Sequence, residues 1–161
     1  MTEALPLPSL PQAEVCSDQI GAICWRMHRG KIEVLLITSR DTGRWVIPKG
    51  WPINGLTLAA AAAREAWEEA GVEGHVLDAS LGHFNYAKIM TPVASIPCSV
   101  VVFGLRVSKL KDRFPERKQR QRKWFGLEKA ARMVDEPGLR ELLRDLPANP
   151  AFHDPAALAL V

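Results

Sequence analysis

The hydrophobic residues near the start of the chain fall into short runs separated by polar turns, which favours strands. Segments 20–27 and 32–38 are apolar runs of strand length, and residues 28–31 between them are mostly polar. A link this short joins neighbouring antiparallel strands, so we predict a hairpin. After a polar loop at 39–44, a further short apolar strand is expected at 45–48.

The pattern changes to a helical one in the next segment. Five consecutive alanines at 59–63 favour a helix and permit close packing on a sheet. Thr57 is a suitable N-cap, and Gly71 is a suitable residue for the left-handed position that ends a helix. We therefore predict a helix at about 57–70.

The rest of the chain alternates between strand and helix signals. Strands are expected at 75–80, 82–90 and 98–107, a short helix at 128–134, and an amphipathic helix with Pro at its first position at 137–146. Strands in mixed order with one central and one terminal helix predict the α/β (α+β) class, with helices covering both faces of a mixed sheet.

Length and composition bound the domain organisation. A chain of 161 residues with 47% hydrophobic residues is long enough for one domain with a sizeable core. We expect a flexible N-terminal arm at 1–17, where prolines recur without periodicity, one domain at 18–146, and a peripheral C-terminal tail at 147–161. There is no apolar run near the ~20 residues of a membrane span and no signal-peptide pattern, so we expect a cytoplasmic protein without a membrane partner.

The cysteines and the charges add two further expectations. Cys16, Cys24 and Cys98 have no CxxC spacing, which predicts reduced thiols rather than disulfides or zinc ligands. The net charge is only +3, but segment 111–123 carries seven basic residues against two acidic ones. This segment is either a solvated charge run or a loop that steers a polyanion toward a binding site.

Three carboxylates provide the strongest chemical signal. Glu65, Glu68 and Glu69 stand at i, i+3 and i+4 of the predicted helix, so they project from one face, and Arg64 reaches Glu68 one turn on. Three like charges this close repel one another. A hard cation relieves that repulsion, and carboxylate oxygens suit Mg²⁺, for which Mn²⁺ can substitute.

These residues belong to a longer pattern, which is Gly50-x5-Leu56-x7-Arg64-Glu65-Ala66-Trp67-Glu68-Glu69-Ala70-Gly71-Val72. It resembles the Nudix box of nucleoside-diphosphate-linked-moiety hydrolases, except that Leu56 stands where that family usually has a glutamate. The resemblance implies an α-β-α sandwich around a mixed sheet. It also implies that Glu65 and Glu69 bind the metal together with the Gly50 carbonyl, that Arg64 orients the glutamates, and that Glu68, favoured over Glu65, accepts the proton.

The segments around the box are similar to those of diphosphoinositol polyphosphate phosphohydrolases, which also act on diadenosine polyphosphates. The similar segments are 38–40, 44–50 and 122–125, although Lys49 replaces a glycine that is often found there. By this resemblance the substrate phosphates would contact Thr38, Ser39, Arg40, Lys88 and one or both of Arg120 and Arg122. Each arginine could instead be a plain surface charge. Trp51 is the best candidate for stacking on a ring.

The sequence therefore predicts a Mg²⁺-dependent pyrophosphohydrolase of a small polyphosphorylated molecule, either a diphosphoinositol polyphosphate or a dinucleoside polyphosphate. Two alternatives stay open. The basic segment suggests an RNA 5′-end pyrophosphohydrolase, although nucleic acid is not the favoured partner, and Leu56 suggests a binding module with weakened catalysis. The sequence leaves the oligomeric state open.

Overall fold

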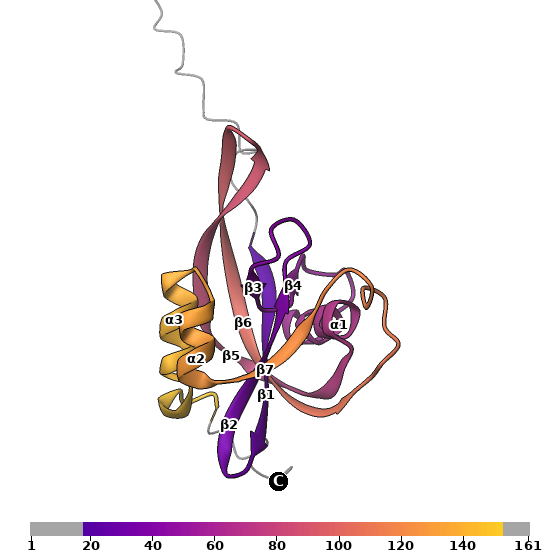
Figure 1. Ribbon diagram of the computed structural model, residues 1–161, viewed down its shortest axis with the longest axis vertical. Coiled ribbons are helices and arrows are strands. Elements are labelled where there is room, and N and C mark those ends of the chain that lie inside the picture. The colour runs from indigo at the N-terminus through magenta and orange to yellow at the C-terminus, as the bar shows by residue number, and fades with distance from the viewer. Residues whose placement is uncertain (1–17, 153–161) are drawn as a thin grey trace, which may run out of the picture.

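The computed structural model describes residues 18–152 as a sheet with three α-helices and one 3₁₀ turn (Figure 1). The predicted N-terminal arm and residues 153–161 of the predicted tail lie outside the described residues. The strands are β1 (Gln19–His28), β2 (Lys31–Thr38), β3 (Trp45–Val46), β4 (Lys49–Gly50), β5 (Val72–Thr91), β6 (Ala94–Leu110) and β7 (Arg122–Gly126). The helices are α1 (Leu58–Ala70), α2 (Leu127–Met133), α3 (Pro137–Arg144) and the 3₁₀ turn η2 (Leu146–Ala148).

The sheet is mixed and has helices on both faces. Its central order is β3-β2-β1-β6-β5, with β4 paired to β1 and β7 paired to β2. β1 and β6 run parallel, while the other pairs are antiparallel. α1 covers one face and α2 and α3 cover the other (Figure 1). The predicted α-β-α sandwich is therefore confirmed.

Strand β1 shows how the sheet forms two cores. Successive strand residues face opposite sides, so Ile20, Ala22 and Cys24 pack in the core under α1, whereas Ile23 and Trp25 pack in the core under α2 and α3. All five side chains are buried. A central strand covered on both faces reads as a continuous apolar run, which explains the unbroken hydrophobic stretch in the sequence.

The elements with local signals are found where they were predicted. β1 and β2 form the antiparallel hairpin, with Cys24 opposite Leu35. The hydroxyl of Thr57 accepts a hydrogen bond from the Ala60 N–H at 3.1 Å, which caps α1. Gly71 ends α1 with φ of 68°, a left-handed conformation that glycine adopts without steric strain. Among residues 18–152, no helix is long and apolar enough to cross a membrane.

The prediction of separate strands at 75–80 and 82–90 is wrong. The structure has one strand, β5, that pairs along its length with β6 through register shifts near Val76, Ser80 and Gly82. Gly82 has φ of 139°, so the backbone bends there without leaving the sheet. A bulge interrupts hydrophobic alternation just as a turn does, and a single sequence does not distinguish the two.

Two further expectations, for Cys98 and for the C-terminal tail, differ from the structure. Cys98 is disulfide-bonded, so the prediction of a reduced thiol is wrong there, whereas Cys24 is a free, buried thiol and Cys16 lies outside the described residues. Spacing along a chain does not reveal which distant thiols the fold brings together. The predicted tail begins inside the core, because Phe152 is buried with its ring 4.6 Å from that of Trp25.

The alanines of α1 generate a prediction about packing. Ala62 is fully buried against the sheet, whereas Ala60 on the same helix is partly exposed. Ala62→Leu should lower the free energy of unfolding by roughly 1–3 kcal/mol, because the larger side chain must displace the strands beneath it. Ala60→Leu is the matched control and should change it far less. Urea unfolding measures both, and equal effects would contradict close packing at Ala62.

Candidate active site

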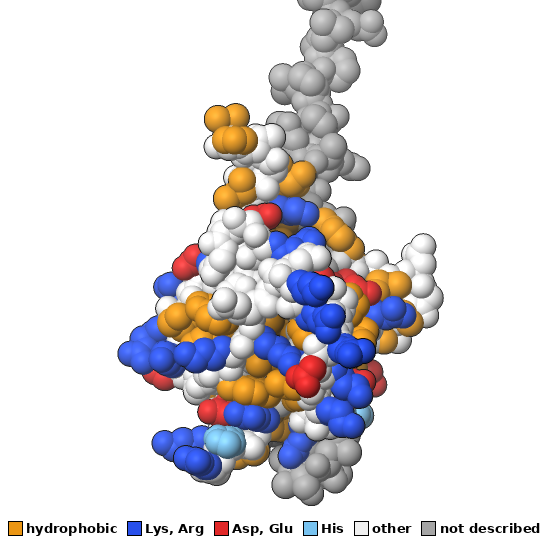
Figure 2. All heavy atoms as spheres, turned by 45° about the vertical axis from the view of Figure 1, so that its right-hand side comes forward, with side chains coloured by type: hydrophobic (Ala, Val, Ile, Leu, Met, Phe, Trp, Pro, Cys, Tyr) orange, Lys and Arg blue, Asp and Glu red, His pale blue; other side chains and the backbone are white. Residues whose placement is uncertain are grey.

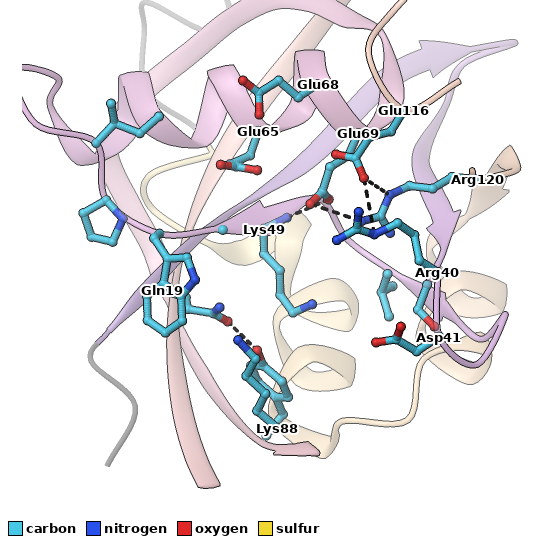
Figure 3. A pocket seen from close by; sticks show the side chains of 17 residues that line it. Gln19, Arg40, Asp41, Lys49, Glu65, Glu68, Glu69, Lys88, Glu116 and Arg120 are labelled. Carbon is cyan, nitrogen blue, oxygen red and sulfur yellow. Dashed lines mark hydrogen bonds and ion pairs between the residues drawn. The ribbon is translucent and has the colours of Figure 1, made fainter. Parts of the chain in front are cut away.

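A cavity of about 570 Å³ lies where α1, β4 and the segment 111–121 meet, and it contains both acidic and basic side chains (Figure 3). Five carboxylates line it, those of Asp41 and of four glutamates, Glu65, Glu68, Glu69 and Glu116. The basic residues in its lining are Arg40, Lys49, Lys88 and Arg120. Three of the carboxylates come from one face of α1, as the i, i+3, i+4 spacing predicted.

Gly50 lies directly against the Glu65 carboxylate. β4 holds Gly50 opposite Ile20 of β1, which places its backbone directly against the helix. A Cβ atom at position 50 would lie 2.3 Å from the carboxylate carbon of Glu65, so no larger residue fits without displacing that carboxylate. The glycine of the motif is therefore required by close approach, because its φ is not in the left-handed region.

Glu69 is held by a buried network. Its side chain accepts a hydrogen bond from the Lys49 N–H at 3.2 Å and lies 3.4 Å from the Arg120 guanidinium. Arg120 also donates from Nε to Glu116 at 3.2 Å, so one guanidinium joins two carboxylates (Figure 3). Because Glu69 is only 8% exposed, this internal cation replaces part of the water that a carboxylate would otherwise have.

The remaining negative charge is poorly compensated. Burial, together with the neighbouring Glu68 and Glu116, raises the pKa of Glu65 to about 7, although Arg120 and Arg64 oppose this effect. Burial also raises the pKa of Glu69 to about 7, although Arg120 opposes that effect. The pKa of Lys49 is lowered by burial, against the pull of Glu69 and Glu136. The cavity thus disfavours a full set of ionised carboxylates unless a cation joins them.

The donor set suits a hard divalent cation. Carboxylates and a nearby backbone carbonyl are the oxygen ligands that Mg²⁺ and Mn²⁺ take, and the Gly50–Glu65 contact brings such groups together. In the described part of the chain, no three Asp, Glu, His or Cys side chains are gathered closely enough to hold an ion as they stand. Glu69 faces Arg120 rather than Glu65, so a bound cation requires a rotation of these side chains.

The other residues predicted for the site do not all lie in the cavity. Arg64 reaches Glu68 at 3.9 Å, and Ser39, Arg40, Lys88 and Arg120 line the cavity. Thr38 lines an adjacent cavity of about 420 Å³ together with Ser39, Arg40 and Arg120.

Arg122 and Leu56 lie elsewhere. The Arg122 guanidinium donates to the Ala70 carbonyl at 2.7 Å and pairs with Asp112 at 3.7 Å, so it is placed at the end of α1. Leu56, 40% exposed, lines a separate cavity on the outer side of the helix. A glutamate at position 56 would therefore not stand among the four glutamates of the active-site cavity.

Sequence reasoning missed Glu116 and Lys49 as members of the site. Glu116 is one of two acidic residues in the basic segment, and that exception to the charge pattern was the available signal. Lys49 was noted only as a departure from a glycine, yet it lines the cavity with its ammonium group 5.1 Å from the centre of the Tyr86 ring. Tyr86 itself donates a hydrogen bond to Gln19.

Known proteins are similar to this chain in sequence and in fold. Residues 18–146 match the NUDIX domain. Nudix hydrolase 16, mitochondrial, of Arabidopsis thaliana is 34% identical over 138 residues, which covers 83% of this chain and 74% of the relative. Diphosphoinositol polyphosphate phosphohydrolase 3-alpha of Mus musculus is 31% identical over 116 residues, covering 71% of this chain and 66% of the relative.

A solved structure and the lengths of other relatives complete the comparison. The C. elegans Ap4A hydrolase superposes with a TM-score of 0.59 at 24% identity, covering 83% of this chain and 97% of that one. At this identity the likeness shows the fold alone. Against other plant Nudix hydrolases the match spans only 51%, 63% and 52% of their length.

The contact between Gly50 and Glu65 gives a prediction. Gly50→Ala should weaken Mg²⁺ or Mn²⁺ binding by at least roughly tenfold, because the added methyl group pushes the Glu65 carboxylate away from its place. Gly126→Ala is the control, since a Cβ there meets no atom within 4 Å. Calorimetric titration with Mn²⁺ measures the affinity. Unchanged binding in Gly50→Ala would remove Glu65 from the ligand set.

The charge of Glu65 gives a second prediction, for the metal-free protein. Its folded-state pKa of about 7 lies above the ordinary 4.5, so folding favours the protonated form and stability falls as pH rises between those values. Above pH 7, Glu65→Gln should therefore melt about 2–4 °C higher than the wild type in EDTA, and the two should converge near pH 4.5. Equal melting temperatures at pH 8 would contradict this repulsion.

Proposed function

This chain belongs to the NUDIX family, and on that premise we propose that it is a Mg²⁺-dependent pyrophosphohydrolase of a small polyphosphorylated molecule. The observation that carries the proposal is the cavity lined by five carboxylates and four basic side chains. Acidic groups suit the cation and the proton transfer, and basic groups suit the phosphate oxygens. A diphosphate linkage needs both, because its own negative charge repels a nucleophile.

The cation would be held by Glu65 and Glu69 with the Gly50 carbonyl. When bound, Mg²⁺ supplies a Lewis acid that neutralises phosphate oxygens and lowers the pKa of a coordinated water. The close contact of Gly50 with Glu65 and the Lys49 N–H bond to Glu69 would keep both carboxylates beside the cavity, and side-chain rotation would bring them to the cation. Arg120 favours the ionised form of Glu69, because its guanidinium lies 3.4 Å from that carboxylate.

Glu68 is the proposed proton acceptor. It is partly exposed, and it pairs with Arg64 at 3.9 Å, a looser contact than those around Glu69. In the reaction, a water oxygen bonds to phosphorus while the bridging P–O bond breaks and its electron pair leaves with the departing phosphate. Glu68 takes the proton of the water. Lys88, Arg40 and Lys49 bind phosphate oxygens and so orient the linkage.

The names of the relatives support a small-molecule substrate. One relative is a diphosphoinositol polyphosphate phosphohydrolase, and one structural neighbour is an Ap4A hydrolase. The basic segment gives less support to RNA than its charge suggested. Its Arg120 and Arg122 are used inside the fold, where they contact Glu69 and the Ala70 carbonyl.

A hydrolysis screen tests the proposal. Purified protein with Mg²⁺ should release phosphate or a phosphorylated fragment from at least one of dinucleoside polyphosphates, diphosphoinositol polyphosphates, nucleotide sugars and 5′-triphosphate RNA. Glu68→Gln should lower kcat by at least ~10² with folding unchanged, because the amide keeps the shape but accepts no proton.

Glu128→Gln is the matched control for that variant. Glu128 is a helical glutamate that pairs with Arg144 at 3.2 Å on α2, away from the cavity, so its kcat should match the wild type. Wild-type turnover in Glu68→Gln would assign the proton to another group. Tight binding of a diphosphate without any hydrolysis would show a binding module instead.

A further inference from the structure

A second cavity of about 690 Å³ adjoins the first and shares part of its wall. The shared residues are Ser39, Asp41, Val46, Lys49, Tyr86 and Lys88. Because the two cavities share this wall, a molecule whose diphosphate lies beside α1 can extend its remaining group toward the second one. The second cavity lies between the 39–44 loop and residues 86–91 of β5, with Asp135 at its edge.

One wall of the second cavity is apolar and exposed. Beyond Tyr86, strands β5 and β6 continue as a hairpin that projects from the sheet (Figure 1). Ile89 and Met90 line the cavity from this hairpin although they are 72% and 55% exposed. Figure 2 shows hydrophobic side chains on the projecting hairpin. Large apolar side chains left exposed beside a site indicate a binding surface.

The arginines around both cavities are already paired with carboxylates. Arg44 lies 2.8 Å from Glu136 and 3.4 Å from Asp135. Arg40 lies 3.5 Å from Glu116, which it shares with the more deeply buried Arg120.

The two lysines of the lining lie over aromatic rings. The ammonium groups of Lys49 and Lys88 are 5.1 Å and 4.9 Å from the ring centres of Tyr86 and Trp51. The two lysines are shared with the first cavity and are assigned to the diphosphate, so an inositol ring with phosphates on every side would need further cations in the second cavity, where Arg44 is the other basic residue of the lining. Paired arginines, an apolar wall and the carboxylates of Asp41 and Asp135 suit a group that carries no charge.

We propose that the second cavity binds the nucleoside of the substrate, so that this chain acts on nucleoside polyphosphates in preference to diphosphoinositol polyphosphates. A base is planar and uncharged, so it can lie against Ile89 and Met90, and its amino group can donate to Asp41. The inference rests on the proposed function, because it names the substrate class of the same site. It assigns selectivity to the hairpin and hydrolysis to α1.

The wild-type protein decides the class directly. Steady-state kinetics with Mg²⁺ should give kcat/KM for diadenosine tetraphosphate at least ~10-fold above that for diphosphoinositol pentakisphosphate. The reverse order overturns the inference and leaves the proposed function standing. If neither compound is hydrolysed, the full screen described above decides the proposed function. In that case titration calorimetry with ADP and with inorganic diphosphate still decides the inference, which requires tighter binding of ADP.

A matched pair of variants tests the hairpin. The double variant Ile89→Asn with Met90→Gln should raise KM for diadenosine tetraphosphate roughly 10-fold and leave kcat nearly unchanged. Its KM for inorganic tripolyphosphate, which has no group to place in the cavity, should equal that of the wild type. Val93→Asn alters a residue that is 97% exposed on the same hairpin and does not line the cavity, so it should change neither value. A wild-type KM for diadenosine tetraphosphate in the double variant, or an equal rise with Val93→Asn, overturns the proposal.

Discussion

Four glutamate carboxylates share one small cavity, and much of the surrounding structure serves to keep them there. Glu69 is the most buried, and it is stabilised by Arg120 and a backbone N–H. Glu65 lies over Gly50, and burial together with its acidic neighbours raises its pKa. The fold therefore gives Glu69 a close counter-charge and leaves Glu65 with weaker compensation. Such a site is strained without a cation and relieved by one, which couples metal binding to the stability of α1.

Segment 111–121, the part of the basic segment that precedes β7, also supports this arrangement of carboxylates. Its backbone N–H groups at Lys111 and Glu116 donate to the carbonyls of Gly71 and Glu68, and Arg122 of β7 donates to Ala70. The last carbonyls of a helix lack internal partners and carry partial negative charge, so these contacts stabilise the end of α1. The same segment brings Glu116 and Arg120 to the cavity. Basic side chains still form a column on the face that Figure 2 brings forward, which is the side where this segment runs in Figure 1.

The sequence predicted those features whose signals are local. The hairpin of β1 and β2, the Thr57 cap and the carboxylate face of α1 depend on residues a few positions apart, and all three are found. Glu69 and Arg120, which pair in the structure, are 51 positions apart along the chain, and no local pattern indicates their pairing. Arg122 shows the same limit of local patterns. A sequence does not distinguish an arginine that binds phosphate from one that donates to the last carbonyls of a helix. The bulged β5 was missed because its irregularities resemble a turn.

The two halves of the site come from different parts of the chain, and this separation has a functional consequence. In the proposed reaction, hydrolysis depends on β4 and α1, where Gly50 lies against Glu65 and the Lys49 N–H donates to Glu69, so a substitution there alters charge balance and stability together. The apolar wall of Ile89 and Met90 lies on a two-stranded projection that shares no buried charge with α1. Packing against the hairpin can therefore change without disturbing the carboxylates. A fold arranged in this way can keep one reaction constant while the group attached to the diphosphate varies, because recognition and chemistry depend on separate contacts.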